Sequence, residues 1–216
     1  MGSEAGLLRL TRAGLPAATA ALAEAFGDYP LLVHAAPDPE RRKALAQAFS
    51  AVALRYALRW GEAYASSPAM EGIAGWVPSH HFPMTAGKLI RAVPLPVLLA
   101  LGRHGGGRMR RAGAYLDALH RRLAPPEHLF LLVLGVRPGF RGRGYAGRLL
   151  RPVLARLDAE GRPCYVDTVN GDAVPMYAHL GFRMVAESRV PGTDLTAWAL
   201  VRDPPPPAGG QSPAEA

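Results

Sequence analysis

The chain has 216 residues and a mass of 23.0 kDa, and 49% of its residues are hydrophobic, so it is long enough for one domain with a buried core. Its longest apolar run, residues 93–101, contains two prolines and is far shorter than the roughly 20 residues that cross a bilayer. Cys164 is the single cysteine, which excludes an intramolecular disulfide and leaves a clustered Cys/His zinc site without its ligands. We therefore expect a cytoplasmic protein with no membrane span and no bound metal.

The net charge of +8 is concentrated in one segment, because residues 88–122 hold eight Lys or Arg residues against Asp117 alone. Such a segment can bind nucleic acid or an acidic partner through its phosphates or carboxylates. It can equally be the solvated face of a helix. Tyr115 is the one aromatic residue among these arginines, and the charges lie opposite an apolar helical stripe, which favours the solvated face.

The first half of the chain predicts a strand, two helices and a hairpin. Residues 6–12 alternate in the manner of a strand, and residues 15–26 have helical periodicity before a Gly/Pro stop. In the next helix, which starts at Asp38, apolar residues recur three or four positions apart, and residues 62–77 predict a hairpin. Residues 85–123 predict two helical segments joined by a flexible stretch at residues 102–108. The apolar stripe of the first long helix consists of Leu45, Phe49, Val52, Tyr56 and Trp60.

The second half begins with a continuous apolar run at residues 128–136, which is typical of a central strand buried on both faces. A glycine-rich loop follows it, and then a helix over about 144–160. Residues 163–168 predict a strand, residues 172–180 a short helix, and residues 182–190 and 194–202 two final strands. The proline-rich tail, residues 204–216, has too few apolar residues to join a core and is expected to be disordered.

The glycine-rich loop, "VRPGFRGRGYAG" at residues 136–147, admits two interpretations. Gly142, Gly144 and Gly147 fit the G-x-G-x-x-G of a dinucleotide-binding fold, and Asp167 lies about 20 residues further on, where that fold places an acid for the ribose. Against it, five residues separate Val136 from Gly142, and the remaining chain is too short for a doubly wound sheet.

The second interpretation takes the loop as R-x-x-G-x-A, which is Arg141, Gly144 and Ala146 at the start of a helix. Small residues there leave backbone N–H groups open to an anion, and the positive end of the helix dipole adds to the attraction. This arrangement predicts a pyrophosphate-binding loop.

This loop resembles the pyrophosphate loop of the GNAT acetyltransferase family, which reads Q/R-x-x-G-x-G/A after a central strand ending in V-x-P. The stretch "NGDAVPMYAHLGF" is similar to the family's next motif, with Asn170, Ala173, Tyr177 and Gly181-Phe182 at its spacing. The stretches "LLRPVLARLDAEGRPCYVDT" and "TAWALVRDP" look like the branch that contains puromycin N-acetyltransferase. Three departures from that branch are Asp167 in place of Glu, Ala173 in place of Asn, and Leu129-Phe130 in place of larger aromatics.

The resemblance implies an α/β fold of the α+β type, with a mixed sheet of about six or seven strands flanked by helices. It implies a single domain over residues 1–203, with the helical insert of about 85–123 before the central strand. The implied activity is transfer of an acetyl group from acetyl-CoA to the amine of an unidentified small-molecule acceptor, which attacks the thioester directly. The alternative is a module that binds nucleic acid or an acidic partner through residues 88–122.

The resemblance also implies a set of site residues. The pantetheine arm of acetyl-CoA would pair with the end of the central strand, which splays from its neighbour, with a β-bulge at Gly135. Tyr177 would donate a proton to the departing thiolate, since a phenol with a pKa of about 10 stays protonated at neutral pH. The implied cofactor-binding residues are Leu134, Gly135, Val136, Arg141, Gly142, Arg143, Gly144, Tyr145, Ala146, Asn170 and Tyr177.

The general base is left open by the sequence. His128 opens the central strand and has an imidazole that can accept the amine's proton, but a solvated histidine at the end of a strand fits equally well. Its rivals are Asp167, Glu127, His80 and His81. Cys164 lies in an apolar strand without a basic neighbour, which favours a core position over a nucleophile. The connection with Trp76, Pro78, His80, His81 and Phe82 can line an acceptor pocket or simply pack as a loop.

Overall fold

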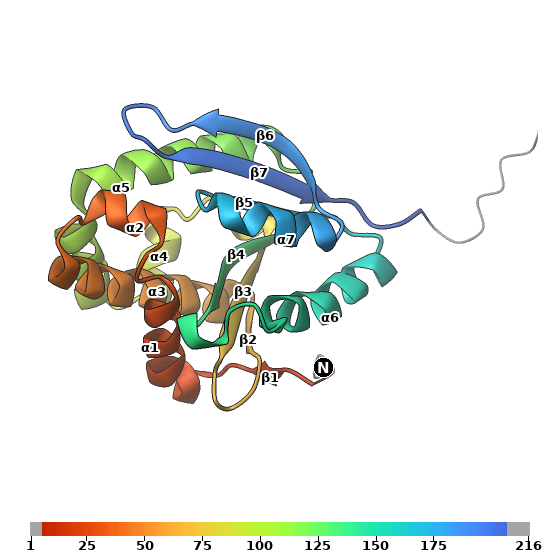
Figure 1. Ribbon diagram of the computed structural model, residues 1–216, viewed down its shortest axis with the longest axis horizontal. Coiled ribbons are helices and arrows are strands. Elements are labelled where there is room, and N and C mark those ends of the chain that lie inside the picture. The colour runs from red at the N-terminus through yellow and green to blue at the C-terminus, as the bar shows by residue number, and fades with distance from the viewer. Residues whose placement is uncertain (1–5, 207–216) are drawn as a thin grey trace, which may run out of the picture.

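The computed structural model describes residues 6–206, and Figure 1 shows how its elements surround one twisted sheet. The sheet has seven strands in the order β1-β2-β3-β4-β5-β7-β6. The pair β4 and β5 is parallel, and the other neighbouring pairs are antiparallel, so the mixed sheet predicted from the sequence is confirmed. The strands are β1 Leu8–Arg9, β2 Glu62–Ala65, β3 Gly72–Pro78, β4 Leu129–Val136, β5 Cys164–Thr168, β6 Arg183–Arg189 and β7 Thr196–Arg202.

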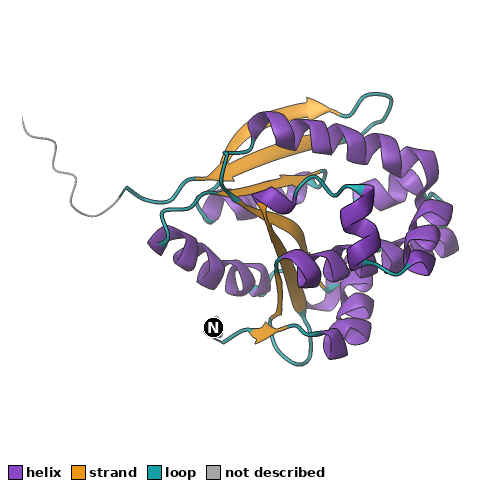
Figure 2. Ribbon diagram, turned by 180° about the vertical axis from the view of Figure 1, so that it is seen from behind, coloured by secondary structure: helices purple, strands orange, loops and turns teal. Residues whose placement is uncertain are grey.

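Helices cover both faces of this sheet (Figures 1 and 2). On one face, α6 and α7 bury their apolar residues against β3, β4 and β5. On the other face, α1, α2 and α3 form one cluster with β2 and β3, and α5 forms a second cluster with β5 and β7. The α-helices are α1 Leu15–Ala25, α2 Pro30–Ala35, α3 Pro39–Trp60, α4 Ala86–Ala92, α5 Leu95–Leu123, α6 Tyr145–Ala159 and α7 Val174–His179. Within residues 6–206, no helix is long and apolar enough to cross a membrane.

The central strand β4 is buried on both faces, as its apolar run predicts. Leu129 and Leu131 belong to the cluster under α6 and α7, whereas Phe130 and Val133 pack on the opposite face. This double burial needs apolar side chains at odd and even positions alike, which is why the run does not alternate.

The structure differs from the prediction at two points in the first part of the chain. The strand predicted over residues 6–12 is limited to Leu8–Arg9, which is the part that pairs with β2. The first helix ends at Ala25, as the Gly/Pro stop predicts, but the short helix α2 follows it, with Pro30 at its first helical position. Proline is favoured there because its missing N–H would have no helical partner anyway.

The predicted helical insert is confirmed as α4 and α5, and its flexible joint lies inside α5. Gly106 has φ +59° and ψ −152°, so α5 is two helices that meet at this residue. A side chain would be strained at this positive φ, which explains the need for glycine. The predicted tail begins at residue 204, and its residues 207–216 lie outside the described part of the chain.

Candidate active site

The two central parallel strands separate soon after they meet. β4 and β5 pair at Leu129 with Cys164 and at Phe130 with Tyr165, and the ladder ends there. Beyond this point a cavity of about 150 Å³ opens between the strands. Of the predicted cofactor-binding residues, those that line it are Leu134, Gly135, Val136, Asn170 and Tyr177. We call it the β4/β5 cleft; its existence confirms the predicted splay.

The predicted bulge, however, lies at Leu132 and not at Gly135. Gly135 pairs in register with Ile73, whereas the register between β3 and β4 shifts where Gly75 faces Val133 and Trp76 faces Leu131. Leu132 is the extra residue, so Leu132 and Val133 both pack toward the helices on the α1–α3 side.

Gly135 is required by close packing. A Cβ atom at this position would lie 2.6 Å from Cδ1 of Leu22 and 2.9 Å from Cβ of Ala25. Both residues belong to α1, so the missing side chain lets this helix approach the end of β4. Position 135 therefore does require glycine, but the reason is the close approach of α1 and not a β-bulge.

The glycine-rich loop forms an open cradle before α6. Gly142 and Gly144 have φ angles of +74° and +78°, and a Cβ atom on either would meet nothing within 4 Å. Gly144 is the N-cap of α6, the cap makes no side-chain hydrogen bond, and the first turn has no acidic residue. The cradle thus offers open space beside the positive end of a helix, which fits a pyrophosphate.

The arginines of the loop have different surroundings. Arg141 donates hydrogen bonds to the carbonyl oxygens of Ala25, at 2.9 Å, and of Val136, at 3.4 Å, so it ties the loop to the end of α1. Arg143 stays over the ring of Phe140, and Tyr145 meets the same ring edge-on. The structure therefore gives Arg141 a bracing contact in addition to its predicted role toward phosphate.

Tyr177 lies in α7 with its side chain buried in the wall of the β4/β5 cleft. Burial raises the pKa of its hydroxyl, and the neighbouring Tyr29 adds to the effect. The phenol therefore carries its proton throughout the neutral range, as a general acid must.

A second cavity, of about 200 Å³, adjoins the first on the helical side. We call it the helical cavity. The two cavities share Tyr29, Phe49, Leu132 and Asp167 in their linings. Most of the helical cavity is apolar, with side chains from α2, α3, α5 and β4, and its charged lining residues within the described chain are Asp117 and Asp167.

Both carboxyl groups have raised pKa values. Burial, and then the charge of Asp117, raise the pKa of Asp167 to about 7. Burial also raises the pKa of Asp117, against a smaller opposing effect of Arg121. A carboxyl group with a pKa near neutrality can take up a proton and release it again at working pH, which is the property of a general base.

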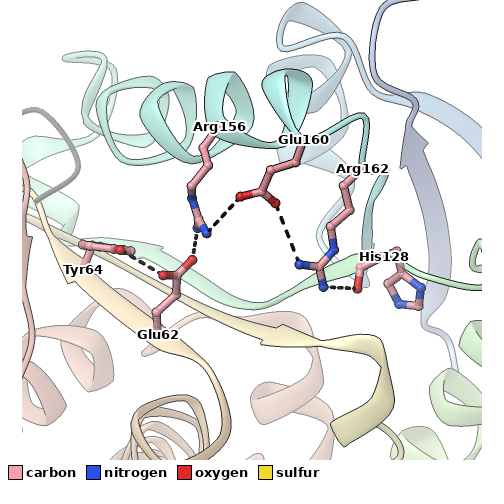
Figure 3. A network of polar contacts seen from close by, with 6 residues as sticks. All are labelled: Glu62, Tyr64, His128, Arg156, Glu160 and Arg162. Carbon is pink, nitrogen blue, oxygen red and sulfur yellow. Dashed lines mark hydrogen bonds and ion pairs between the residues drawn. The ribbon is translucent and has the colours of Figure 1, made fainter. Parts of the chain in front are cut away.

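His128 does not line either cavity. One ring nitrogen, Nδ1, lies 2.5 Å from the carbonyl oxygen of Pro125, and the other, Nε2, lies 2.9 Å from Nε2 of His120. Its carbonyl oxygen accepts a hydrogen bond from Arg162, which begins a chain of ion pairs that runs to Glu62 (Figure 3). The carboxylate of Glu62 accepts a further hydrogen bond from the hydroxyl of Tyr64. His128, the predicted base, therefore lies outside both cavities.

A contact through His120 nevertheless links His128 to the cavities. Nδ1 of His120 lies 3.8 Å from Oδ2 of Asp167 and has no hydrogen-bond partner. The carbonyl oxygen of Pro125 can only accept a hydrogen bond, so Nδ1 of His128 must carry a proton. Nε2 of His128 then accepts a hydrogen bond from Nε2 of His120. Nδ1 of His120 is therefore left without a proton, as an acceptor. This acceptor faces Asp167 and favours the protonated form of its carboxyl group.

The other candidate bases and the cysteine lie away from the cleft. Glu127 and His80 line a separate surface cavity beyond the start of β4. The ring of His81 packs at a tilt against those of His80 and Trp60, and burial lowers the pKa of its imidazole. Cys164 is fully buried, and burial raises the pKa of its thiol, which agrees with a core residue.

In the connection after the hairpin, Phe82 reaches the helical cavity, and Trp76 is buried in the core instead. Three residues of the site were missed by sequence reasoning: Tyr29, Asp117 and His120. Their signals were an aromatic residue before Pro30, a lone acid in a basic segment, and a histidine three positions after it. Within residues 6–206, no cluster of three or more His, Cys, Asp or Glu side chains is arranged to hold a metal ion.

Known proteins share both the motifs and the fold. Residues 105–182 match the model of the "Acetyltransferase (GNAT) family". A Corynebacterium glutamicum protein described as "histone acetyltransferase HPA2 and related acetyltransferase" has a TM-score of 0.63 at 21% identity, covering 94% of this chain and 97% of that one. An agmatine N-acetyltransferase variant gives 0.63 at 20% identity, covering 92% and 99%.

A polyamine N-acetyltransferase of Drosophila melanogaster, which catalyses the formation of N-acetylagmatine, gives a TM-score of 0.61 at 20% identity, covering 91% of this chain and 98% of that chain. At these identities the structural neighbours establish the fold, and the family match begins within α5 and ends just after α7. Residues 105–182 are therefore similar to the GNAT acetyltransferase family, and the chain as a whole has the GNAT fold.

Proposed function

We propose that the protein transfers the acetyl group of acetyl-CoA to the primary amine of a small molecule. The observation that carries the proposal is the meeting of the two cavities at Asp167, one between the splayed strands and one among the helices. A donor and an acceptor that enter from these two sides would meet beside a carboxyl group with a pKa near neutrality.

Acetyl-CoA would lie in the β4/β5 cleft, with its pyrophosphate at the loop from Arg141 to Ala146. Beyond Phe130, the backbone groups of β4 that face β5 have no strand partner within the described chain. They are therefore open to the amide groups of a pantetheine arm, and a backbone N–H among them can stabilise the developing oxyanion. The open cradle at Gly142 and Gly144 supports the placement of the phosphates.

In the proposed reaction Asp167 accepts one proton and Tyr177 donates another. The ammonium group of the acceptor loses one proton to Asp167, because an apolar cavity lowers an amine's pKa toward that of the carboxyl group. The neutral nitrogen then attacks the thioester carbonyl, a C–N bond forms and the C–S bond breaks. Tyr177 donates its proton to the departing sulfur and is restored by the proton that the new amide nitrogen loses.

The helical cavity supports a small, largely apolar amine as the acceptor. Its volume of about 200 Å³ lies below the roughly 300–1,000 Å³ typical of drug-sized ligands, so a compact body fits it. Asp117 and Asp167 would attract the ammonium group, and the surrounding apolar side chains would hold the rest of the molecule. The resemblance to the branch of puromycin N-acetyltransferase stays a prediction, and it does not identify the acceptor. Cytoplasmic location likewise stays a prediction.

A turnover screen tests this proposal. The protein is incubated with acetyl-CoA and a series of primary amines that each carry a single charge and differ in the size of their apolar part. Diamines, an aminoglycoside and a peptide with a free N-terminus are tested beside them. Released thiol and acetylated product are both measured, and we expect products from the compact apolar amines. Thiol release without any acetylated amine would contradict transfer.

The same preparation also tests the alternative that residues 88–122 bind nucleic acid. The arginines at positions 103, 108, 110, 111, 121 and 122 are exposed along α5. Tight DNA or RNA binding that weakens steeply with salt, together with no acetylated product from any amine, would favour the binding module over the enzyme.

A further inference from the structure

A third cavity lies on the surface where α1, α3, α4 and α5 approach one another. Its volume is about 490 Å³, and four arginines line it from three different parts of the chain. Arg12 precedes α1, Arg55 and Arg59 lie one turn apart on α3, and Arg91 lies in the last turn of α4. We call it the arginine cavity.

The four guanidinium groups have no anionic partner in the described chain. No carboxylate lines the cavity, and no ion pair or side-chain hydrogen bond joins any of the four to another residue of 6–206. The Nε atom of Arg55 is buried without a hydrogen-bond acceptor. Like charges one helical turn apart and a buried unpaired donor both lower stability, and an anion in the cavity would relieve both.

The start of α5 adds to this electropositive surface. The cavity is also lined by Pro94 and Leu95, the N-cap and first residue of that helix. The cap makes no side-chain hydrogen bond, and no acidic residue lies in the first turn. The partial positive charge of the helix end is therefore uncompensated on the same side as the arginines.

The arginine cavity is distinct from the site proposed for acetyl-CoA. It touches α1 at Leu15 and Pro16, whereas the β4/β5 cleft begins at Ala25 and Phe26, at the other end of that helix. The eleven residues of α1 span roughly 16 Å at 1.5 Å per residue. One ligand does not fill both places, because α1 lies between them.

We propose that the arginine cavity binds a ligand with two or more phosphate groups. Guanidinium groups bind phosphate oxygens through paired, charge-assisted hydrogen bonds, and four of them match several negative charges better than a single carboxylate. Ile90 and Leu95, with exposed fractions of 67% and 62%, border the same cavity. The phosphate groups can therefore belong to a soluble organic phosphate or to the headgroup of a phosphorylated lipid.

Calorimetric titration of pyrophosphate into the full chain, with the β4/β5 cleft saturated by CoA, tests the site. We expect saturable binding of one pyrophosphate per chain. Arg55→Gln with Arg91→Gln should weaken it about tenfold or more, because two charge-assisted contacts are removed. The matched control, Arg110→Gln with Arg111→Gln on the exposed face of α5, changes the net charge equally and should leave the dissociation constant within about twofold.

Thermal melts show whether Arg55→Gln alters the core. Because Arg91 is exposed, the single variant Arg91→Gln tests the cavity independently of folding. Equal weakening in the control pair, or no saturable binding at all, would overturn the proposal. Co-sedimentation with phosphatidylcholine vesicles, with and without phosphatidylinositol bisphosphate, separates the two sources of phosphate. Vesicle binding that the cavity variant loses assigns the lipid headgroup, and pyrophosphate binding without vesicle binding assigns a soluble ligand.

Discussion

Tyr177 presents a buried hydroxyl to the cleft where the thiolate would leave. Replacement by Phe keeps the ring, which packs edge-on against Phe182, and removes the donor. We predict that Tyr177→Phe lowers kcat by roughly 10² or more, the range of general acid catalysis, with little change in affinity for acetyl-CoA. Steady-state rates and calorimetry measure the two quantities. Near-full kcat, with chemistry shown to limit the rate, would remove Tyr177 from the mechanism.

The raised pKa of Asp167 leads to a prediction about how the rate depends on pH. Its raised pKa of about 7 means that the carboxyl group is mostly protonated below neutrality and becomes a competent base above it. We predict that kcat/KM rises with pH through about 7 in the wild type. In Asp167→Asn, the rate should fall by roughly 10² to 10⁴ and the rise near pH 7 should disappear. A variant that keeps the same rising limb would assign the base to another group.

His128 has a prediction of its own, because it fixes the tautomer of His120. His128→Phe removes the acceptor for Nε2 of His120, so the proton of His120 is free to move to Nδ1 and point at Asp167. A donor there stabilises the carboxylate, and we predict that the midpoint of the pH–rate profile moves below that of the wild type. An unchanged midpoint with reduced stability would make the histidine pair purely structural.

The residues that the sequence identified are those fixed by local motifs. Asn170 and Tyr177 lie in one short stretch, and the structure brings both to the cleft. Asp117 and His120 meet Asp167 only because α5 folds back across the sheet, which is a tertiary contact that no local spacing records. The imidazole of His128 suits a general base chemically, but its position just before β4 places it away from the point where β4 and β5 separate.

Among the elements, the end of β4 depends on a close contact with α1. We predict that Gly135→Ala lowers the free energy of unfolding by about 1–3 kcal/mol, because the added methyl group would lie 2.9 Å from Cβ of Ala25, an atom that moves only with the helix. Chemical denaturation measures the change. Gly139→Ala is the control, since its Cβ atom would meet nothing within 4 Å. Equal stability of the two variants would show that the contact is unimportant.

Elements with strong periodicity were predicted well, and those set by neighbours were not. The β4 run, the α6 helix and the hairpin of β2 and β3 follow from their own residues. The two-residue length of β1 depends on where β2 offers partners, and the bulge at Leu132 depends on which face of the sheet each leucine meets. Both are decided by packing between segments far apart in the chain.

The splay of β4 and β5 would let one sheet serve the two proposed substrates. Parallel pairing holds the strands together at one end, and helices on opposite faces would separate the proposed donor side from the proposed acceptor side. The mixed sheet and the helical insert could be predicted from element order and two motifs. The helical cavity could not, because its walls come from α2, α3, α5, β4 and β5, which lie far apart in the chain.

We predict that acetyl-CoA binds in the β4/β5 cleft with its pyrophosphate at the loop before α6. Calorimetric titration of acetyl-CoA and NAD tests it on the wild type, on Gly144→Val, and on Gly161→Val as the matched control. Gly144 and Gly161 both have positive φ angles, +78° and +62°, with open space around them, and they flank opposite ends of α6. We expect the wild type to bind acetyl-CoA and not NAD, with acetyl-CoA binding weakened about tenfold or more by Gly144→Val and little changed by Gly161→Val. Preferential binding of NAD, or equal affinity of all three proteins for acetyl-CoA, would contradict it.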